Sequence, residues 1–593
     1  MSRKFTLIII GLCLCGAGVV EGSQAPTPEE LLEEISSARV RRGKSFDPVP
    51  IVDRATSYDW PLHNSDLANS RFVSLEQINS QNVNKLSVNW LYHTGNSRAT
   101  PIVVNGLMYI AKSDSVVALD ASTGRPVWEN AEASGTRGAA YGQGVVYVAS
   151  DVRVMALDAI TGEFVEAFGD NGVSFVLNEV LRIKYPDLEE PMKWGYRYNM
   201  APQYHDGVLI VGTALSESHI PGGLVLAIEA DTGSLLWSFL TIPQGPDDEG
   251  WNVAKDTWAG GVRHGGGVWG TPAVDPATDT VHLTVANPSP DQDGSARRGM
   301  NLFTNAFVTL GLRTGKIQWY YQQVHHDIWD YDAGQQPTLF DVFVDDMLVP
   351  VTAAGNKNGL LYLLNRNSGE PINPIIETPV PTSSLTPGEE VWPTQPIPYT
   401  RDGKPIEPLA SQFPTENLYP EFGSYPKVPF YTPPTPDGAL HAPREGIHYG
   451  VSSFNPQTGL LYVAGRDFPV LMTSISVGDS LVPGQFSTAG RRLSAAPALG
   501  NVSAYAPGTG ERVWRTDLDG GPSAGTLSTA GNLVFTADRQ GVFYALNAET
   551  GDLLWEFFTG ATVSGGQISY QVNGSQYVSV PAGNVLITFS LND

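Results

Sequence analysis

The sequence predicts an all-β fold, an eight-bladed β-propeller of four-stranded antiparallel blades. A phrase of the form apolar-x-x-x-Thr-Gly-x-x-x-Trp recurs along the chain and ends at Trp128, Trp237, Trp319, Trp514 and Trp555. The closest copies lie about 40 residues apart, which is the length of a propeller blade. Charged residues make up only 16% of the chain, whereas 62 glycines and 44 prolines favour turns between short strands.

Degenerate copies of the phrase surround Gly162, Gly369 and Gly459, so the sequence holds eight copies and predicts eight blades. In each copy we expect the Thr-Gly or Ser-Gly pair to form a hairpin turn. The Trp on the next strand should pack between neighbouring sheets. The ring is expected to close where the strand around Trp90 meets the last strands, 577–590.

Residues 1–25 are typical of a secretory signal peptide, which predicts a periplasmic protein. Arg3 and Lys4 precede an apolar run over 5–20 that is too short for a comfortable membrane span. An uncleaved anchor is the alternative, because Pro26 follows the best cleavage site. The two cysteines lie inside this segment and C-x-x-C-H is absent, so the mature chain would carry neither a disulfide nor a covalent haem.

Three further parts are expected along the chain. Residues 26–57 should form an N-terminal arm with a short helix over 28–42, since Pro and Glu residues follow a Thr cap at its start. Residues 58–593 should form the propeller, preceded in its first part by a helix over 75–86. The Pro-rich stretch 371–445 lacks the repeat and is expected to be an insertion between blades.

The net charge of −25 restricts the partners of the protein. With 61 acidic and 36 basic residues, the surface repels phosphate backbones and anionic lipids, so nucleic acid is excluded as a partner. A basic redox protein or a neutral small molecule is favoured.

One stretch, V-H-H-D-I-W-D-Y-D-A-G over 324–334, concentrates titratable side chains in an otherwise β-rich chain. Such groups are costly to bury unless they bind or react with something. The stretch therefore predicts a functional site, with a solvated acidic turn as the alternative. Within it, His325 and His326 are either packed histidines or part of a substrate entrance.

The repeats, together with H-H-D-I-W-D-Y-D, resemble the quinoprotein dehydrogenases from about Asp59 to the C-terminus. The resemblance implies pyrroloquinoline quinone (PQQ) and a bound metal ion as cofactors, and an alcohol or sugar as substrate. It also implies an eight-bladed propeller, in agreement with the repeats.

The resemblance assigns roles to seven residues. Asp330 of the W-D pair would be the catalytic base. The cofactor-binding residues would be Arg137 of T-R-G-A-A-Y, Trp269 of G-V-W-G-T-P and Lys357 of G-N-K-N-G. The metal ligands would be Glu217 of L-S-E-S-H, Asn287 of N-P-S-P-D, Asp330 and Asp332. Their chemistry is suitable, because PQQ is a polyanion that needs basic partners and a hard cation takes oxygen ligands.

Some of these residues also have plainer interpretations. Glu217 could be a solvated loop carboxylate, Trp269 a core residue between blades, and Lys357 an ordinary turn residue. The chain also departs from the family. The adjacent cysteine pair expected before Arg137 is replaced by N-A-E-A-S-G-T, and His448 stands near the place of a cofactor-binding Asn.

The metal is expected to be Ca²⁺, with a lanthanide as the alternative, because Asp332 lies two residues after the base, as in lanthanide-dependent members. The sequence thus predicts a periplasmic PQQ-dependent oxidoreductase acting on an alcohol, polyol or sugar. Without haem, its electrons would pass to a separate cytochrome c or to ubiquinone. A non-catalytic propeller scaffold of the cell envelope is the alternative function, and a propeller hydrolase is disfavoured because no nucleophile–base pair stands out.

Overall fold

The computed structural model describes residues 44–45 and 49–591, apart from 96, 189, 215, 407–417 and 479. All of them belong to a compact unit that spans 43–593. The predicted signal peptide and the predicted helix over 28–42 lie outside the described residues. No helix among the described residues is long and apolar enough to span a bilayer.

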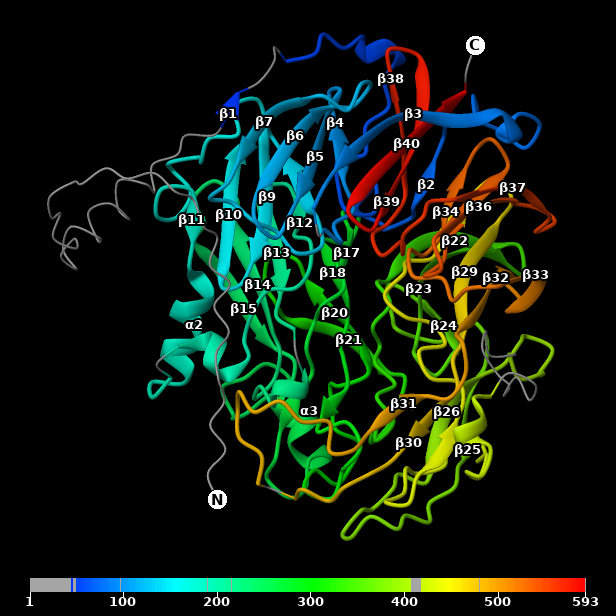
Figure 1. Ribbon diagram of the computed structural model, residues 1–593. Helices are drawn as coiled ribbons and strands as arrows, with labels where there is room; N and C mark the ends of the chain where they lie inside the picture. Colours follow the sequence, from blue (N-terminus) through cyan, green and yellow to red (C-terminus); the bar gives the residue numbers. More distant parts are fainter. Residues whose placement is uncertain are drawn as a thin grey trace, which may run out of the picture. The chain divides into compact units, whose positions relative to one another are not determined.

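Eight sheets follow one another along the chain as the blades of a propeller (Figure 1). Blade 1 consists of β4 (Ile102–Val104), β5 (Leu107–Ala111), β6 (Val116–Asp120) and β7 (Pro126–Asn130), with β1 (Lys44–Ser45) added at its outer edge. Blade 2 consists of β8 (Ala139–Gly142), β9 (Val145–Ser150), β10 (Arg153–Asp158) and β11 (Val173–Ser174). Blade 3 consists of β12 (Gln203–His205), β13 (Val208–Gly212), β14 (Leu224–Glu229) and β15 (Leu235–Leu240). Blade 4 consists of β17 (Ala273–Asp275), β18 (Thr280–Thr284), β20 (Ala306–Gly311) and β21 (Ile317–Gln322).

The second half of the ring is less regular. Blade 5 has only β22 (Thr338–Val344), β23 (Met347–Gly355) and β24 (Leu361–Asn365). Blade 6 consists of β28 (Ser453–Asn455), β29 (Leu460–Asp467), β32 (Leu499–Ala506) and β33 (Glu511–Leu518). Blade 7 consists of β34 (Leu527–Thr529), β35 (Leu533–Ala537), β36 (Val542–Asn547) and β37 (Leu553–Phe558), with β2 (Phe72–Val73) parallel to β34. Blade 8 consists of β38 (Ile568–Val572), β39 (Ser575–Ala582), β40 (Val585–Leu591) and β3 (Leu86–His93).

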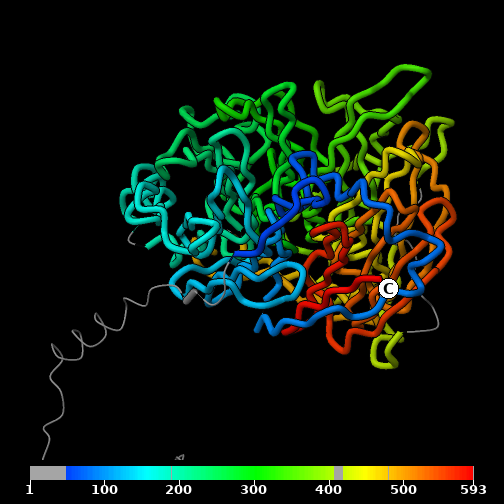
Figure 2. The backbone as a smooth tube through the Cα atoms, turned by 90° about the horizontal axis from the view of Figure 1, so that it is seen from above, coloured from blue at the N-terminus to red at the C-terminus, as the bar shows by residue number. Residues whose placement is uncertain are grey.

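The ring closes as predicted, because β3 pairs antiparallel with β40, from Leu86 opposite Leu591 to His93 opposite Val585. Figure 1 shows the blue β3 beside the red β40. Viewed from above in Figure 2, the tube of this unit passes from cyan through green and yellow to orange and red around the ring. Blade 8 is therefore built from both ends of the propeller chain.

The repeat phrase builds the contacts between blades. The ring of each docking Trp covers a turn glycine of the next blade, and a Cβ on that glycine would lie 2.4 to 2.6 Å from the ring. The pairs are Trp90 with Gly124, Trp128 with Gly162, Trp237 with Gly315, Trp319 with Gly369, and Trp514 with Gly551. Each indole N–H also donates to a backbone carbonyl of the same turn, at 2.8 to 3.3 Å. The predicted packing of Trp between sheets is confirmed.

The copies of the repeat do not map one to each blade, although both counts are eight. The turns with Gly459 and Gly510 both belong to blade 6. Blade 8 has no copy, since its outer strand comes from the other end of the chain and no turn joins β40 to β3. In blade 5 the outer strand is reduced to a bridge between Leu364 and Pro371, because proline cannot donate a ladder hydrogen bond.

Three small sheets and several short helices lie outside the blades. The sheets contain β16 (His264–Gly265) with β19 (Pro288–Ser289), β25 (Ile375–Pro379) with β26 (Thr394–Pro398), and β27 (Ala439–His441) with β30 (Val470–Met472) and β31 (Arg492–Ser494). We call the last of these the cap sheet. The helices are α2 (Val176–Lys184), α3 (Trp251–Ala254), and the 3₁₀ turns η1 (Arg54–Thr56), η2 (Val83–Lys85), η3 (Pro191–Trp194), η4 (Ser216–Ser218), η5 (Lys255–Thr257) and η6 (Pro420–Phe422).

The helix predicted over 75–86 is wrong. Only η2 is helical there, and β3 begins at Leu86. The backbone of the stretch instead bonds to neighbouring blades: the Ile78 N–H donates to Gln576 Oε1 of blade 8 at 2.8 Å, and the Ser80 N–H donates to the Gly531 carbonyl of blade 7 at 2.9 Å. Tertiary contacts override the local helix propensity here.

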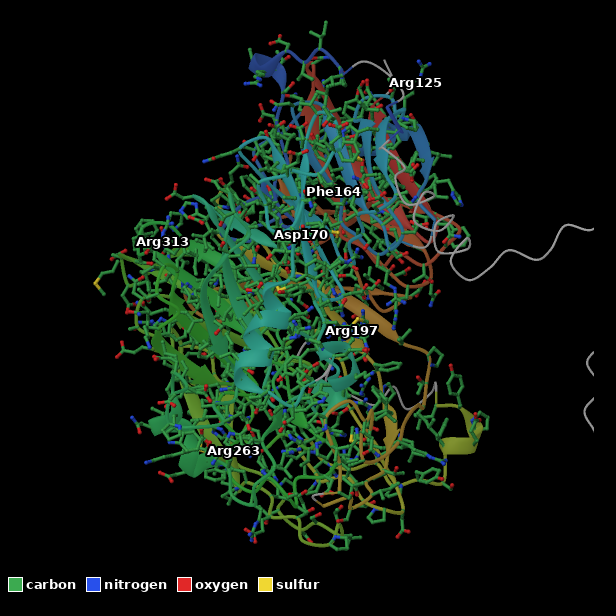
Figure 3. The ribbon with its side chains drawn as sticks, turned by 90° about the vertical axis from the view of Figure 1, so that its left-hand side faces the viewer. Arg125, Phe164, Asp170, Arg197, Arg263 and Arg313 are labelled. Atoms are coloured by element: carbon green, nitrogen blue, oxygen red, sulfur yellow. The ribbon has the colours of Figure 1, made fainter. Side chains whose placement is uncertain are left out.

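Surface ion pairs add to the links between blades. Arg313, labelled at the edge of the unit in Figure 3, belongs to blade 4 and reaches Asp206 of blade 3 at 2.5 Å. Both side chains are exposed, so this pair contributes little compared with the buried Trp docking. The blades are therefore held mainly by apolar packing.

Candidate active site

The candidate site lies on the face of the propeller opposite the Thr-Gly turns. Strands within a blade are antiparallel, so loops that join the second strand to the third emerge at the same end as the links between blades. Glu217, Asn287 and Lys357 follow the second strands β13, β18 and β23, and Asp330 follows the outer strand β21. The topology alone thus brings four residues from blades 3, 4 and 5 to one face.

Six of the seven predicted residues line one cavity of about 180 Å³ on this face. The cavity is bounded by Arg137, Asn199, Ala214, Ser216, Glu217, Trp269, Ala286, Asn287, Asp332, Lys357 and His448. The seventh residue, Asp330, lies behind Lys357, whose Nζ is 2.7 Å from Asp330 Oδ1. His448, which the sequence aligned only loosely with a cofactor-binding position, also belongs to the wall.

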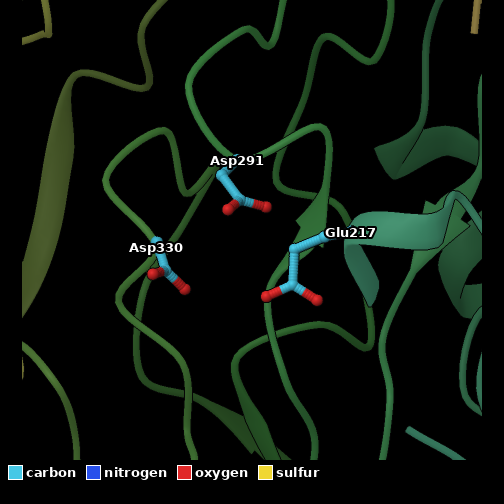
Figure 4. A group of neighbouring side chains, drawn as sticks. All are labelled: Glu217, Asp291 and Asp330. Carbon is cyan, nitrogen blue, oxygen red and sulfur yellow. The ribbon is translucent and has the colours of Figure 1, made fainter. Parts of the chain in front are cut away.

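Three carboxylates point toward a common space beside this cavity (Figure 4). Each of Glu217, Asp291 and Asp330 offers one oxygen, and these oxygens lie within 4.8 Å of one another. Oxygen donors at this spacing suit a hard cation such as Ca²⁺ or a lanthanide. The Asn287 side-chain amide donates to Asp291 Oδ1 at 2.9 Å, so the predicted ligand Asn287 lies next to the group.

Sequence reasoning missed Asp291. The only signal was its place at the end of N-P-S-P-D, four residues after Asn287, in a turn that brings both side chains to one side. Asp332, by contrast, lies outside the group of three. Its Oδ1 accepts from the Asn287 N–H at 2.8 Å and its Oδ2 is 2.7 Å from Lys357 Nζ. The ligand role of Asp332 stays a prediction.

Asp330 is surrounded by cations. Its Oδ1 pairs with Lys357, while its Oδ2 pairs with Arg444 at 2.5 Å and also with Arg492. Burial by itself would raise the pKa of Asp330, but the charges of Arg492, Lys357 and Arg444 outweigh it and hold that pKa well below its usual value. The residue is held in the left-handed region, with φ 63°, which aims its carboxylate into this group.

The two arginines were not predicted. Arg444 follows β27 and Arg492 begins β31, so both come from the cap sheet rather than from the blades. Neither lies in a repeat or in a motif quoted for the family, so no sequence pattern indicates that they reach the site. Only the folding of the cap sheet over the site brings them to Asp330.

The remaining acids of the site favour a bound cation. Burial, together with the charges of Asp330 and Asp332, raises the pKa of Glu217. Burial also raises the pKa of Asp291 well above its usual value, although Arg492 opposes this effect. Carboxylates that are this costly to ionise in isolation gain most when a metal ion neutralises them.

Arg137 is fixed by its neighbours rather than by an acid. Its guanidinium carbon lies 4.1 Å from the Tyr449 ring centroid, and its Nε donates to the Asn199 carbonyl at 2.8 Å. Tyr449 in turn stacks on Trp269, with ring centroids 5.6 Å apart and planes 19° from parallel. The wall therefore offers a flat aromatic surface and a cation that no carboxylate among the described residues pairs with. That combination suits an aromatic polyanion such as PQQ.

The other polar residues of 324–334 have structural roles. Asp327 accepts hydrogen bonds from the backbone N–H groups of Trp329 and Tyr331, both at 2.8 Å, and so shapes the loop before Asp330. His325 and His326 are buried and contact Glu377 and Glu389 of the 371–445 stretch, at 3.0 and 2.6 Å. They are packed histidines and not part of the cavity wall.

Comparison with known proteins identifies the family of this chain. The family described as "Glucose/ethanol/alcohol dehydrogenase, beta-propeller domain" matches residues 60–483, and that described as "Outer membrane protein assembly factor BamB" matches 498–593. The chain is 30% identical to a quinohemoprotein alcohol dehydrogenase of Comamonas testosteroni, over 90% of this chain and 73% of that protein. It is 26% identical to the quinoprotein glucose dehydrogenase of Escherichia coli, over 98% of this chain and 82% of that protein.

Solved structures give the same result. The crystal structure of the Comamonas testosteroni enzyme superposes with a TM-score of 0.72 and 27% identity, covering 91% of this chain and 81% of the other. A europium-containing methanol dehydrogenase superposes with a TM-score of 0.70 and 23% identity, covering 90% and 98%, which supports the fold alone. The predicted eight-bladed propeller is thus confirmed by the eight sheets of the ring, and the match to the Comamonas testosteroni enzyme supports it. The chain belongs to the family of PQQ-dependent alcohol and glucose dehydrogenases.

Proposed function

We propose that this chain is a periplasmic oxidoreductase that oxidises an alcohol, polyol or sugar with PQQ and a bound metal ion. Its electrons would pass to a separate cytochrome c or to ubiquinone. The observation that carries the proposal is the adjacency of three converging carboxylates to a cavity walled by Trp269, Arg137 and Lys357. A scaffold would have no use for this arrangement, and the match to the BamB family covers only 498–593, which contains none of these residues.

The residues would divide the work as follows. Glu217, Asp291, Asp330 and Asn287 would hold the metal ion, for which Ca²⁺ is the first choice and a lanthanide the alternative. Trp269 would lie against the flat face of PQQ, and Arg137 would bind one of its carboxylates. When bound, PQQ supplies a two-electron oxidant and the metal ion supplies a Lewis acid.

Asp330 would take the proton of the substrate hydroxyl on its carboxylate, as a general base. Lys357 would orient that carboxylate through its 2.7 Å contact and stabilise negative charge that develops beside it. Asp332 anchors Lys357 from the other side at 2.7 Å. We further propose that 1–25 are a cleaved signal peptide, 26–57 an arm, 58–593 the propeller domain, and 371–445 an insertion over the site.

The test is reconstitution of the purified apoprotein with PQQ and either Ca²⁺ or a light lanthanide. We expect cofactor absorbance and dye-linked oxidation of at least one compound in a panel of alcohols, polyols and sugars. The metal that supports the higher turnover identifies the resident ion. If the protein shows no PQQ binding and no turnover with either metal, the dehydrogenase function is overturned and the scaffold function is left.

A further inference from the structure

We propose that Arg492 is a built-in counter-cation of the metal site, which a metal ion must displace before it can bind Asp291 and Asp330. This inference rests on the proposed function, because it takes the three carboxylates as a metal site. It adds a residue of the cap sheet that sets how tightly the metal is held. The metal class is a hard cation, Ca²⁺ or a lanthanide.

The contacts place the Arg492 guanidinium between two of the ligands. Its Nη1 is 2.9 Å from Asp291 Oδ2 and also contacts Asp330 Oδ2. These carboxylates belong to the group whose oxygens lie within 4.8 Å of one another (Figure 4). A metal ion in this space would bind the same Asp291 and Asp330 oxygens that Arg492 Nη1 contacts, and the two positive charges would repel each other strongly in a buried site. The guanidinium and the metal ion are therefore competitors.

Asp291 depends on this arginine. Among the described residues, Arg492 is the only cation within ion-pair distance of its carboxylate, and Asp291 is fully buried. Lys357 is engaged with Asp330 and Asp332, and Arg444 with Asp330 and Glu445. A buried carboxylate with no cation is costly, so Arg492 stabilises the metal-free protein.

The position of Arg492 also allows its side chain to move away from the two carboxylates. It begins β31, the short edge strand of the cap sheet, whose order is β27–β30–β31. Its side chain is 17% exposed, whereas those of Lys357 and Asp291 are 6% and 0% exposed. Because the cap sheet lies outside the blades, a change of the Arg492 side chain leaves the propeller core intact.

The neighbouring residue provides a matched control. Arg491 has the same side chain and directly precedes β31, but it is exposed, and successive side chains of an extended chain point to opposite sides. No ion pair of Arg491 is found within the described part of the chain. R491Q therefore removes the same charge from the protein without touching the carboxylates.

The experiment measures metal affinity on the apoprotein without PQQ, by terbium luminescence and by calorimetric titration with Ca²⁺. We expect R492Q to bind both ions at least tenfold more tightly than wild type, R491Q to bind like wild type, and D291N to bind at least tenfold more weakly. Metal-free R492Q should unfold at a lower temperature than wild type, and saturating Ca²⁺ should remove the difference.

Equal affinity of R492Q and R491Q would overturn the inference, and so would absence of metal binding in all variants. R492K serves if R492Q does not fold. A lysine carries the charge but not the planar fork, so we expect affinity at least threefold tighter than wild type, and unchanged affinity would equally overturn the inference. Turnover with PQQ is measured on the same preparations. If R492Q binds metal more tightly as expected but wild type shows no turnover, only the proposed function is contradicted.

Discussion

At the scale of single residues, the base proposed for the reaction is held by three cations and a strained backbone. Lys357, Arg444 and Arg492 all contact the Asp330 carboxylate, which fixes its orientation before any ligand arrives. Fixed charges of this kind need no reorganisation during a reaction. An arginine that leaves with no other cation in its place would make Asp330 a stronger base.

The first prediction concerns this carboxylate. D330N keeps the shape of the side chain but cannot accept the substrate proton, so turnover should fall by about 10²–10⁴-fold. Binding of PQQ, followed by its absorbance, should persist because Arg137 and Trp269 are untouched. D231N, which changes an exposed carboxylate in the Thr-Gly turn of blade 3, is the control. Wild-type turnover in D330N would contradict the assignment of the base.

The second prediction concerns pH and the buried His282. Burial lowers its pKa to about 3, and its ring nitrogens contact Thr309 Oγ1 at 2.9 Å and Thr280 Oγ1 at 3.2 Å. The unfolded chain, with a histidine pKa of about 6.5, binds a proton more readily. Stability from this residue is thus present above pH 6.5 and falls toward pH 3, by up to about 1.4 kcal/mol per pH unit.

H282Q removes this titration, so its free energy of unfolding should depend less steeply on pH between 6.5 and 4 than that of wild type. The partly exposed His205 gives the control, H205Q, which should keep the wild-type slope. Denaturant unfolding at a series of pH values measures both. Parallel slopes for H282Q and wild type would contradict the prediction.

At the scale of elements, the link between blades is a Trp ring on a turn glycine. Gly551 has φ +77°, and a Cβ there would lie 2.5 Å from the Trp514 ring. Gly459 has nearly the same backbone, φ +68°, within a copy of the same phrase, but no atom lies within 4 Å of its would-be Cβ. Substituting each glycine in turn therefore distinguishes the cost of backbone strain from the cost of disturbing the Trp contact.

The third prediction follows from this pair. G459A should lower the free energy of unfolding by about 1–2 kcal/mol, the cost of a side chain in the left-handed region. G551A should lower it by about 1–3 kcal/mol more, because the indole has to move. Denaturant unfolding of both variants measures the difference. Equal losses would mean that the Trp contact contributes nothing beyond the turn.

Some secondary-structure elements were predicted correctly from the sequence and others were not. The spacing of about 40 residues predicted a propeller correctly, because five of the copies supply the glycine against which a docking Trp packs. The copies could not show that Gly459 and Gly510 both lie in blade 6, because the two turns have the same sequence pattern and the same positive φ at the glycine. The predicted helix over 75–86 is wrong because its backbone bonds to Gly531 of blade 7 and Gln576 of blade 8, which lie more than 400 residues further along the chain.

At the scale of the whole molecule, charge governs how partners approach. A net charge of −25 creates a long-range field that attracts cations and repels anions. A small redox partner with a basic surface would therefore be steered toward the protein. The effect is screened by salt, with a Debye length of about 10 Å at 0.1 M.

The fourth prediction is that electron transfer to a basic cytochrome c slows at least about tenfold between 10 and 200 mM salt. The rate with an uncharged quinone as acceptor should change little, because no field acts on it. Steady-state oxidation with each acceptor across a salt series measures this. A salt-independent rate with the cytochrome would exclude electrostatic steering.

The site was predictable to the extent that its residues lie in motifs on second-strand loops. Glu217, Asn287 and Lys357 converge because the propeller aligns equivalent loops, so motif and topology together place them. Asp291 was within reach, since it ends the quoted N-P-S-P-D turn. Arg444 and Arg492 could not be predicted, because the segments that form the cap sheet contain no repeat. Only tertiary packing determines which of their side chains reach the site.

The seam between β3 and β40 sets the order in which the protein can be completed. During synthesis β3 emerges early, and its partner emerges only after nearly all the other strands. A ribosome that stops before Val585 releases a chain in which blade 8 lacks its central pairing and β3 is left as a bare edge. Bare strand edges recruit other chains, so such products are candidates for aggregation and proteolysis. Loss of β40 would therefore open the ring at blade 8 and would not merely shorten an exposed segment.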